Sequence, residues 1–325
     1  MRLEGKTVLL VTDSGFLEER RGCAARIRGL VRALRSTGCR VHVFSTTRAA
    51  RWKRSAVKRA GISSAISMNS PLRNAYLALR AHVPESLLDT VKFVFFHRRW
   101  ARERARKAEG FALADFESDD VVRALSETWR ELRPNVVIVE YIRLAYTLRA
   151  IGPSSITVVD THDVMYLRQK AFEAQGIEHW LNVSEEEETA RLQKFDIVVA
   201  IQQSDAEQFR RMVPDTTVVT VPPCVSLPND YRAPPPAGAS KRVLTVGSSS
   251  TANSEGLADF LDNAWPLIRR AHPDAELIVC GGVCRYFKGD EAQGMRLLGV
   301  VPDLSKQYAR ADVVISPVTF SGGIK

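Results

Sequence analysis

The chain has 325 residues, of which 45% are hydrophobic and 26% charged, with a formal net charge of +9. This composition is typical of a globular protein and excludes a disordered chain, and no apolar run approaches the roughly 20 residues of a membrane span. The N-terminus lacks the apolar core of a signal peptide, and the five scattered cysteines favour a reducing compartment. We therefore expect a cytoplasmic protein of two domains.

Short runs rich in Val and Ile recur along the chain, with helical segments between them. The runs are apolar on both faces, which is typical of central strands in a parallel sheet that helices cover on both sides. Alternation of such strands with helices predicts a doubly wound α/β architecture. The expected strands occupy residues 7–13, 41–45, 136–141, 156–160, 196–202, 216–222, 242–247, 275–281, 296–301 and 312–318.

Three of the intervening helices carry start signals. Ser204 followed by Glu207 predicts a capping box after the strand 196–202. Ser184 followed by Glu187 predicts a capping box, and the acidic run 185–188 suits the positive end of a helix dipole. The same glutamates could also hold a metal ion, but the pattern favours a helix start. Asn253 or Ser254 is expected to cap a helix of the second domain.

The segment from residue 48 to residue 107 is strongly basic. It holds 15 Lys or Arg and three acids, an excess of +12 in a chain whose remainder sums to −3. Aromatic residues lie among these cations, as in residues 96–100, which is typical of helices that rest on an anionic membrane surface. We expect a basic helical insertion over about residues 48–110. A solvated arginine-rich face is the alternative, and the absence of a groove-reading motif argues against nucleic acid.

A proline-rich stretch divides the predicted strands into six and four. Residues 222–236 contain six of the chain's 15 prolines, which neither a helix nor a central strand accommodates. We therefore expect a first doubly wound domain over residues 1–225, a linker over 226–240 and a second over 241–325. Such domains usually have five or six strands, so the second is predicted to be incomplete and the chain a fragment.

Ligands of doubly wound sheets bind beyond the carboxyl ends of the strands. In the first domain these ends carry Glu140, Tyr141 and the turn 160–163. In the second they carry residues 247–253 and the sequence Gly-Gly-Ile-Lys at 322–325, where glycine N–H groups and a lysine could bind phosphate. On its own, that last motif is a weak signal and more often marks a plain strand-to-helix turn.

An ordered series of short motifs runs through the second half of the chain. They are Val246-Gly247, Asn253, Gly256, Pro273-Asp274, Gly281, Gly299-x-Val301-x-Asp303-Leu304, Tyr308-x-x-Ala311-Asp312, Pro317 and Gly322-Gly323-x-Lys325. This half resembles the nucleotide-sugar-binding half of the family 4 glycosyltransferases, which have the GT-B fold of two Rossmann-like domains that face a cleft. The first half resembles their acceptor domain in Gly22, Arg26, Leu30, Leu34 and Gly38.

The resemblance implies transfer of a sugar from a nucleoside diphosphate sugar, with retention and without a metal or other cofactor. The acceptor would be a glycan or a polyprenyl- or lipid-linked saccharide, in cell-surface polysaccharide or glycolipid synthesis. It implies catalytic roles for His162 and Asp163, and an acceptor-side position for Glu140 and Tyr141. The implied donor-binding residues are Gly22, Gly247, Ser248, Asn253, Val301, Gly322, Gly323 and Lys325.

The sequence departs from the family pattern in two places. No Lys or Arg follows Gly247 closely, and a pair of glutamates seven residues apart is expected just beyond Lys325, where the chain ends. His162 could also be a structural residue of its turn. A nicotinamide-dependent oxidoreductase is disfavoured, because no Gly-x-Gly-x-x-Gly turn follows Val11. A degenerate transferase that acts as a binding protein stays an alternative.

Overall fold

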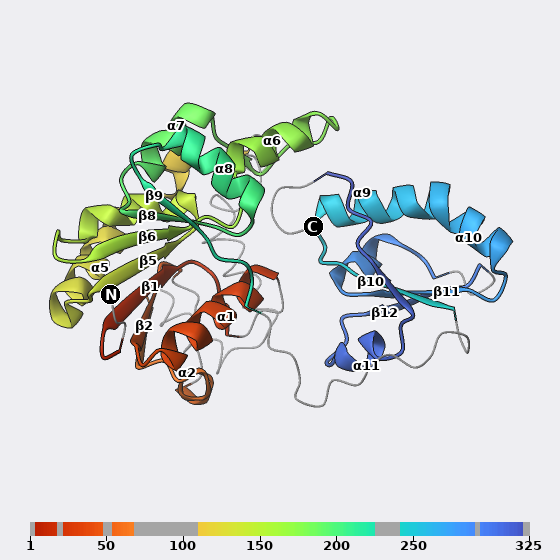
Figure 1. Ribbon diagram of the computed structural model, residues 1–325, viewed down its shortest axis with the longest axis horizontal. Helices are drawn as coiled ribbons and strands as arrows, with labels where there is room; N and C mark the ends of the chain where they lie inside the picture. The colour runs from red at the N-terminus through yellow and green to blue at the C-terminus, as the bar shows by residue number, and fades with distance from the viewer. Residues whose placement is uncertain are drawn as a thin grey trace, which may run out of the picture. The chain divides into compact units, whose positions relative to one another are not determined.

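The computed structural model describes residues 4–17, 22–47, 54–67, 110–224, 241–289 and 293–320. The chain divides into two compact units, residues 1–225 and 226–321. Each unit is built on a sheet of parallel strands with helices packed against it, as Figure 1 shows. The predicted α/β class is therefore confirmed. The predicted linker over residues 226–240 lies outside the described residues.

The first unit contains a seven-stranded sheet in the order β3-β2-β1-β5-β6-β8-β9, in which every neighbouring pair is parallel. All six strands that the sequence predicts for this unit are present, each within about two residues of its expected limits. The strands are β1 (Thr7–Thr12), β2 (Arg40–Ser45), β3 (Ser64–Ser67), β5 (Val136–Glu140), β6 (Ile156–Asp160), β8 (Ile197–Ala200) and β9 (Thr217–Thr220).

Strand β3 was not expected from the sequence. It lies in the predicted basic helical insertion, yet it extends the main sheet parallel to β2, and α2 (Arg54–Ala60) connects the two strands. Val57 and Ala60 of α2 pack against the core, whereas Lys58 and Arg59 are exposed. The prediction of a wholly helical insertion is wrong here, because β3 has a single large apolar residue and charge dominated the pattern around it. Residues 68–109 lie outside the described residues.

Helices cover both faces of this sheet, as the two-sided apolar strands require. Alternate residues of β1 point to opposite faces. Val8 and Leu10 pack with Ile27 of α1 (Gly22–Ser36), whereas Leu9 and Val11 lie in the opposite core with Leu125 of α5 (Asp119–Leu132). The opposite core also receives side chains from α6 (Met165–Glu173), α7 (Glu185–Leu192), α8 (Gln203–Met212) and a 3₁₀ segment, Ile142–Ala150. A separate two-stranded ribbon pairs β4 (Phe111–Ala112) with β7 (Leu181–Asn182).

The acidic run at the start of α7 has two roles. The predicted capping box of Ser184 and Glu187 is confirmed, since the Ser184 hydroxyl accepts from the backbone N–H of Glu187 at 3.1 Å. The predicted box of Ser204 and Glu207 is wrong, because α8 begins at Gln203 with Gln202 as its N-cap. Glu188, however, is fully buried, and its carboxylate accepts from the backbone N–H groups of Met165 and Tyr166 at 3.0 and 2.9 Å. These are the first residues of α6, so one glutamate of the run satisfies the N-terminus of a neighbouring helix. Burial raises the pKa of Glu188 to about 7.

We expect Glu188→Gln to lower the free energy of unfolding by about 1.5–3 kcal/mol, the usual worth of hydrogen bonds to a charged group. The amide has one oxygen where the carboxylate has two, so one N–H of α6 loses its acceptor. Urea unfolding would measure the change. Glu186→Gln, an exposed position two residues earlier in the same helix, is the control and should leave the midpoint nearly unchanged. Equal midpoints for Glu188→Gln and the wild type would contradict the assignment.

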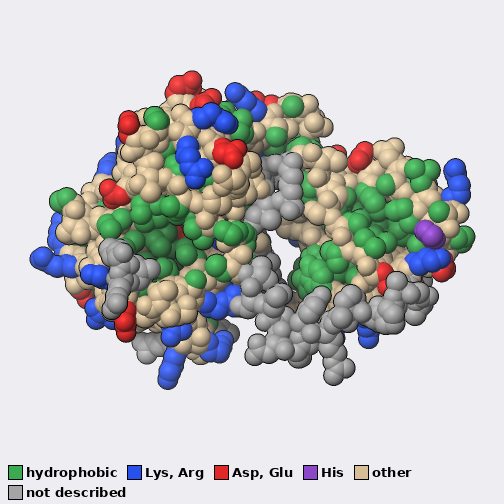
Figure 2. Space-filling model, in the orientation of Figure 1, with side chains coloured by type: hydrophobic (Ala, Val, Ile, Leu, Met, Phe, Trp, Pro, Cys, Tyr) green, Lys and Arg blue, Asp and Glu red, His purple; other side chains and the backbone are tan. Residues whose placement is uncertain are grey.

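The second unit contains a four-stranded sheet, all parallel, in the order β12-β11-β10-β13. Its strands are β10 (Arg242–Val246), β11 (Glu276–Cys280), β12 (Met295–Gly299) and β13 (Val313–Ile315), and all four were predicted. The sequence pattern predicted a central strand at β13, but β13 is an edge strand of the described sheet. Val313 and Val314 are accordingly each 52% exposed. Figure 2 shows hydrophobic side chains on the surface of this unit.

The first helix of the second unit begins earlier than predicted. The N-cap of α9 (Thr251–Asp259) is Ser250, so neither Asn253 nor Ser254 is the cap. The helix continues through a π-helical turn, Phe260–Ala264, into α10 (Trp265–Ala271). Pro266 lacks the N–H that regular α-helical bonding would need there, which accounts for the wider turn. A short helix, α11 (Ser305–Tyr308), precedes β13.

Candidate functional site

A cavity of about 500 Å³ lies in the first unit, within the usual range for small-molecule sites. Residues from the ends of β1, β5 and β6 contribute to it. From β1 the chain continues outward through β2 and β3 on one side of the sheet, and then crosses back to β5 and continues outward on the other side. The direction of strand order therefore reverses between β1 and β5. The cavity is therefore at the topological switch point, where doubly wound sheets bind ligands. Its lining consists of Asp13, Ser14, Cys23, Tyr141, Arg143, Asp163, Met165, Arg168 and Trp180.

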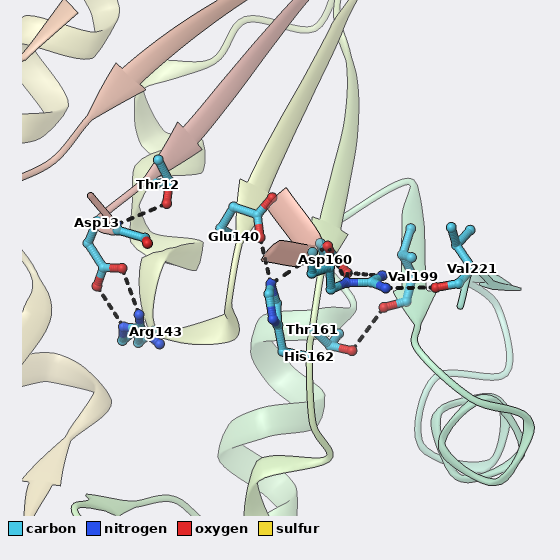
Figure 3. Close-up of polar contacts among 11 residues, drawn as sticks. Thr12, Asp13, Glu140, Arg143, Asp160, Thr161, His162, Val199 and Val221 are labelled. Carbon is cyan, nitrogen blue, oxygen red and sulfur yellow. Dashed lines mark hydrogen bonds and ion pairs between the residues drawn. The ribbon is translucent and has the colours of Figure 1, made fainter. Parts of the chain in front are cut away.

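The charged residues of this lining form ion pairs. Arg143 donates from Nε and Nη2 to the two carboxylate oxygens of Asp13, at 2.7 and 2.6 Å, as Figure 3 shows. Arg168 donates from Nη1 to Asp163 at 2.8 Å. Burial raises the pKa of Asp163, and the charge of Arg168 opposes that shift. The lining thus presents two acids and two arginines whose charges balance.

Aromatic rings stack along one side of the cavity. The ring of Tyr141 lies 4.0 Å from that of His162 at an interplanar angle of 15°, and the guanidinium carbon of Arg143 lies 4.0 Å from the centroid of the same tyrosine. Tyr141 and His162 both have positive φ, 68° and 63°. Non-glycine residues adopt that conformation at a cost, and such residues cluster at functional sites. Trp180 is 40% exposed, and its ring lies 5.6 Å from Arg143.

A buried polar network lies behind Tyr141. His162 Nε2 is 2.6 Å from Glu140 Oε2 and 3.7 Å from Asp160 Oδ2, and Glu140 is fully buried. Arg26 of α1 donates from Nε and Nη2 to the Asp160 carboxylate, at distances down to 2.6 Å, and from Nη1 to the carbonyl of Val221 at 2.9 Å. The parallel register of β5 and β6 pairs Glu140 directly with Asp160, which explains the proximity of the two acids.

Glu140 and His162 hold a proton between them. Burial, and then the charge of Asp160, raises the pKa of Glu140 to about 7. Burial alone would lower the pKa of His162, but the hydrogen bond and charge of Glu140 outweigh it, so the pKa is raised. With that proton, two carboxylates face two cations in the network. Among the described residues none is shown to bond His162 Nδ1. His162 is only 6% exposed and is not among the residues that line the cavity.

The ligand atoms of Glu140, Asp160 and His162 lie within 4.8 Å of one another, close enough to consider a metal ion. The geometry does not favour one. Glu140 and His162 are in direct hydrogen-bond contact, and both oxygens of Asp160 accept from Arg26. A divalent ion would have to break these bonds and add two positive charges beside a buried guanidinium. The prediction that the protein binds no metal stays a prediction.

The other predicted donor residues that the structure describes do not line this cavity, although Gly22 directly precedes Cys23 of the lining. Gly22 begins α1, and no atom of the described residues lies within 4 Å of where its Cβ would be. Gly247 and Asn253 line a space of about 10 Å³, which is room for about one water. Asn253 donates to the Ser248 carbonyl and hydroxyl at 3.1 and 3.0 Å. Val301 packs beside Val246 in a hydrophobic cluster. Gly322, Gly323 and Lys325 lie outside the described residues.

Sequence reasoning found Glu140, Tyr141, His162 and Asp163 but missed most of the cavity lining. Asp13 is only the last residue of the first predicted strand, 7–13, and a basic residue soon after a strand is a weak signal for Arg143. Arg168 lies on α6, and Trp180 directly precedes β7 of the two-stranded ribbon. Nothing in the sequence around either residue indicates a site. Their contribution depends on how α6 and β7 fold back over the sheet edge.

The comparisons with known proteins agree with this fold. Residues 240–325 match the family described as "Glycosyl transferases group 1". A mutant of S. aureus TarM in complex with fondaparinux, alpha-GlcNAc-glycerol and UDP has a TM-score of 0.61 at 8% identity, over 97% of this chain and 82% of its own. A sucrose-phosphate synthase from Thermosynechococcus elongatus has a TM-score of 0.60 at 14% identity. The similarity covers 97% of this chain and 76% of the synthase chain.

The chain has the GT-B fold. A putative UDP-N-acetylglucosamine 2-epimerase from Listeria monocytogenes is also similar, with a TM-score of 0.51 at 11% identity, over 95% of this chain and 73% of its own. Because proteins named for different activities, a synthase and an epimerase among them, are similar to it, the GT-B fold by itself does not fix the reaction. No curated protein matches the sequence. Among the described helices, none combines the length and apolar character needed to cross a bilayer.

Proposed function

We propose that the protein is a retaining glycosyltransferase of family 4, which moves a hexosyl group from a nucleoside diphosphate sugar to a glycan or lipid-linked acceptor. The observation that carries the proposal is the match of residues 240–325 to the glycosyl transferases group 1 in a chain with the GT-B fold. The switch-point cavity of the first unit supports it, because it places charged side chains at the sheet edge. The cell process we propose is polysaccharide or glycolipid synthesis.

His162 and Asp163 are the catalytic residues of this proposal. Glu140 accepts from His162 Nε2–H and so fixes the ring orientation, which leaves Nδ1 to hydrogen-bond a hydroxyl of the transferred sugar. The raised pKa of His162 favours the protonated ring, in which Nδ1 is a donor. Asp163 lines the cavity and can orient a hydroxyl of a bound substrate. Glu140 and Tyr141 support this acceptor-side wall.

The donor would be bound mainly by backbone and small residues. The N-terminus of α1 at Gly22 carries the positive end of a helix dipole, which suits a diphosphate. Gly322, Gly323 and Lys325 would stabilise the charge that grows on the leaving diphosphate. No metal or other cofactor takes part in this scheme.

We also propose that the basic segment 48–107 rests on an anionic membrane near the acceptor. Its exposed Lys58 and Arg59 on α2 are consistent with such contact. Flotation with vesicles of neutral and of anionic lipid, at low and high salt, tests this. We expect the protein to float only with anionic vesicles at low salt. Equal recovery of the protein with neutral and anionic vesicles would contradict the proposed membrane contact.

A donor screen tests the main proposal. The purified chain is mixed with UDP-glucose, UDP-N-acetylglucosamine, GDP-mannose or ADP-glucose and a pool of saccharide acceptors, and NMR follows the anomeric signals. We expect a new glycoside with the anomeric configuration of the donor, and its loss in His162→Ala. An inverted product would contradict retention. Isomerised donor without a glycoside would indicate an epimerase, and bound but unchanged donor would indicate a binding protein.

A further inference from the structure

We propose that the cavity of the first unit binds an electrically neutral sugar residue of the acceptor, in preference to a phosphate or carboxylate group. The inference rests on the proposed transferase function and adds the chemical class of the acceptor's terminal unit. Three features of the cavity support the inference. Its arginines are paired with acids, its carboxylates have oxygen atoms that can accept further hydrogen bonds, and the ring of Trp180 is exposed.

The arginines of the cavity are already paired with acids. Arg143 gives two donors to both oxygens of Asp13, and the two side chains are only 12% and 21% exposed. Such a two-bond fork is the arrangement by which arginine binds phosphates, so a phosphate that used this edge of the guanidinium would have to displace Asp13. The displaced carboxylate and Asp163 would then stand beside the incoming anion, where like charges in a poorly solvated site repel. A dianionic group therefore fits this cavity badly.

Neutral hydroxyl groups need not displace Asp13 and are not repelled by the carboxylates. Each carboxylate oxygen has a second lone pair, so Asp13 and Asp163 can accept from sugar hydroxyls and keep their arginine partners. Arg168 pairs with Asp163 through Nη1 alone, and its Nε is a buried donor without a partner among the described residues. A ligand that offers both donors and acceptors without net charge can satisfy such groups together. A polyhydroxylated sugar is that kind of ligand.

Trp180 provides an apolar platform beside these polar groups. It is 40% exposed, and its ring meets Phe116 edge-on at 6.1 Å and 82°. Its carbonyl accepts from the backbone N–H of Phe111 at 2.8 Å, at the start of the ribbon β4–β7. The ring is thus held before any ligand arrives, which lowers the ordering cost of binding. Sugars present a C–H face that packs on an aromatic ring while their hydroxyls bond sideways.

The test compares neutral with charged probes on the full chain in the absence of donor. Saturation-transfer NMR and calorimetry are run with methyl glycosides of glucose, galactose, mannose and N-acetylglucosamine, and with glucose 6-phosphate, mannose 6-phosphate and glucuronate. We expect at least one neutral glycoside to bind and the anionic sugars to bind more weakly. Trp180→Ala should weaken the neutral probe about three- to ten-fold, and Trp180→Phe should retain most of the affinity. Tyr308→Ala, which removes an exposed aromatic ring of the second unit, is the matched control and should bind as the wild type does.

The outcomes separate this inference from the proposed function. Tighter binding of the phosphates or of glucuronate, no binding of any neutral glycoside, or unchanged affinity in a folded Trp180→Ala variant would each overturn the inference. If the chain transfers sugar only to anionic acceptors, the transferase function stands and the inference fails. If neutral glycosides bind through Trp180 but no donor is turned over, the inference about the cavity stands and the transferase function fails.

Discussion

Replacing Arg26 with methionine is expected to lower the free energy of unfolding of the first unit by about 3–5 kcal/mol, the cost of breaking a buried ion pair by removing one partner. Arg26 and Asp160 are 6% and 1% exposed, and their closest atoms are 2.6 Å apart. Without the guanidinium, Asp160 stays buried beside a second acid, Glu140, and loses its strongest partner. The carbonyl of Val221 also loses its donor.

Urea unfolding monitored by circular dichroism would measure this loss. Arg123→Met is the matched control, because Arg123 pairs with Asp120 at 3.5 Å on the surface, where the two side chains are 72% and 54% exposed. That substitution should change stability by less than about 0.5 kcal/mol. A second substitution, Asp160→Asn, should recover part of the loss in Arg26→Met, because it removes the unpaired charge. Equal effects of Arg26→Met and Arg123→Met would contradict the assigned role.

The stability of the first unit should fall as pH rises above 6.5, and Glu140→Gln should flatten that dependence. The folded state holds the proton of His162 with a raised pKa, whereas the unfolded chain releases it near 6.5. The folded state therefore binds more protons above that pH. This contribution is fully present below pH 6.5 and is lost as pH rises through the folded pKa of His162, with a slope of at most about 1.4 kcal/mol per pH unit for one proton.

Urea unfolding midpoints measured between pH 6 and pH 9 give the slope of stability against pH for the wild type and for Glu140→Gln. The glutamine has no charge to hold the proton, so burial dominates and the pKa of His162 should fall below its usual value. NMR of the imidazole nitrogens reads that pKa directly and separates it from a general loss of stability. Glu131→Gln, at an exposed position of α5, is the control and should keep the wild-type slope. An unshifted His162 pKa in Glu140→Gln would overturn the shared-proton assignment.

Much of the fold followed from local pattern. Parallel strands buried on both faces must be apolar on both faces, so all ten predicted strands are present. β3 was missed because Ser64–Ser67 has almost no apolar signal and owes its place to pairing with β2. The predicted Asn253 cap was wrong because Ser, Thr and Asn occur throughout residues 248–254, and local sequence did not decide among them.

The candidate site depended on contacts between residues distant in the chain. Strand-end position alone singled out Glu140 and His162, since the carboxyl ends of parallel strands share one edge. It did not identify Arg26 as the partner of Asp160, 134 residues away. It also gave no reason to join Arg143 with Asp13, or Trp180 with either.

The sequence by itself determined the alternation of strands and helices, the α/β class, and the sheet edge at which polar residues gather, because each depends on hydrophobic periodicity and chain direction. Only the tertiary structure decided which strand lies beside which, and hence that β1 and β5 meet at the switch point. Strand order and register depend on packing between elements far apart in sequence. They bring Glu140 opposite Asp160, place Arg26 against both β6 and the segment after β9, and leave the cavity that Tyr141 and Trp180 line.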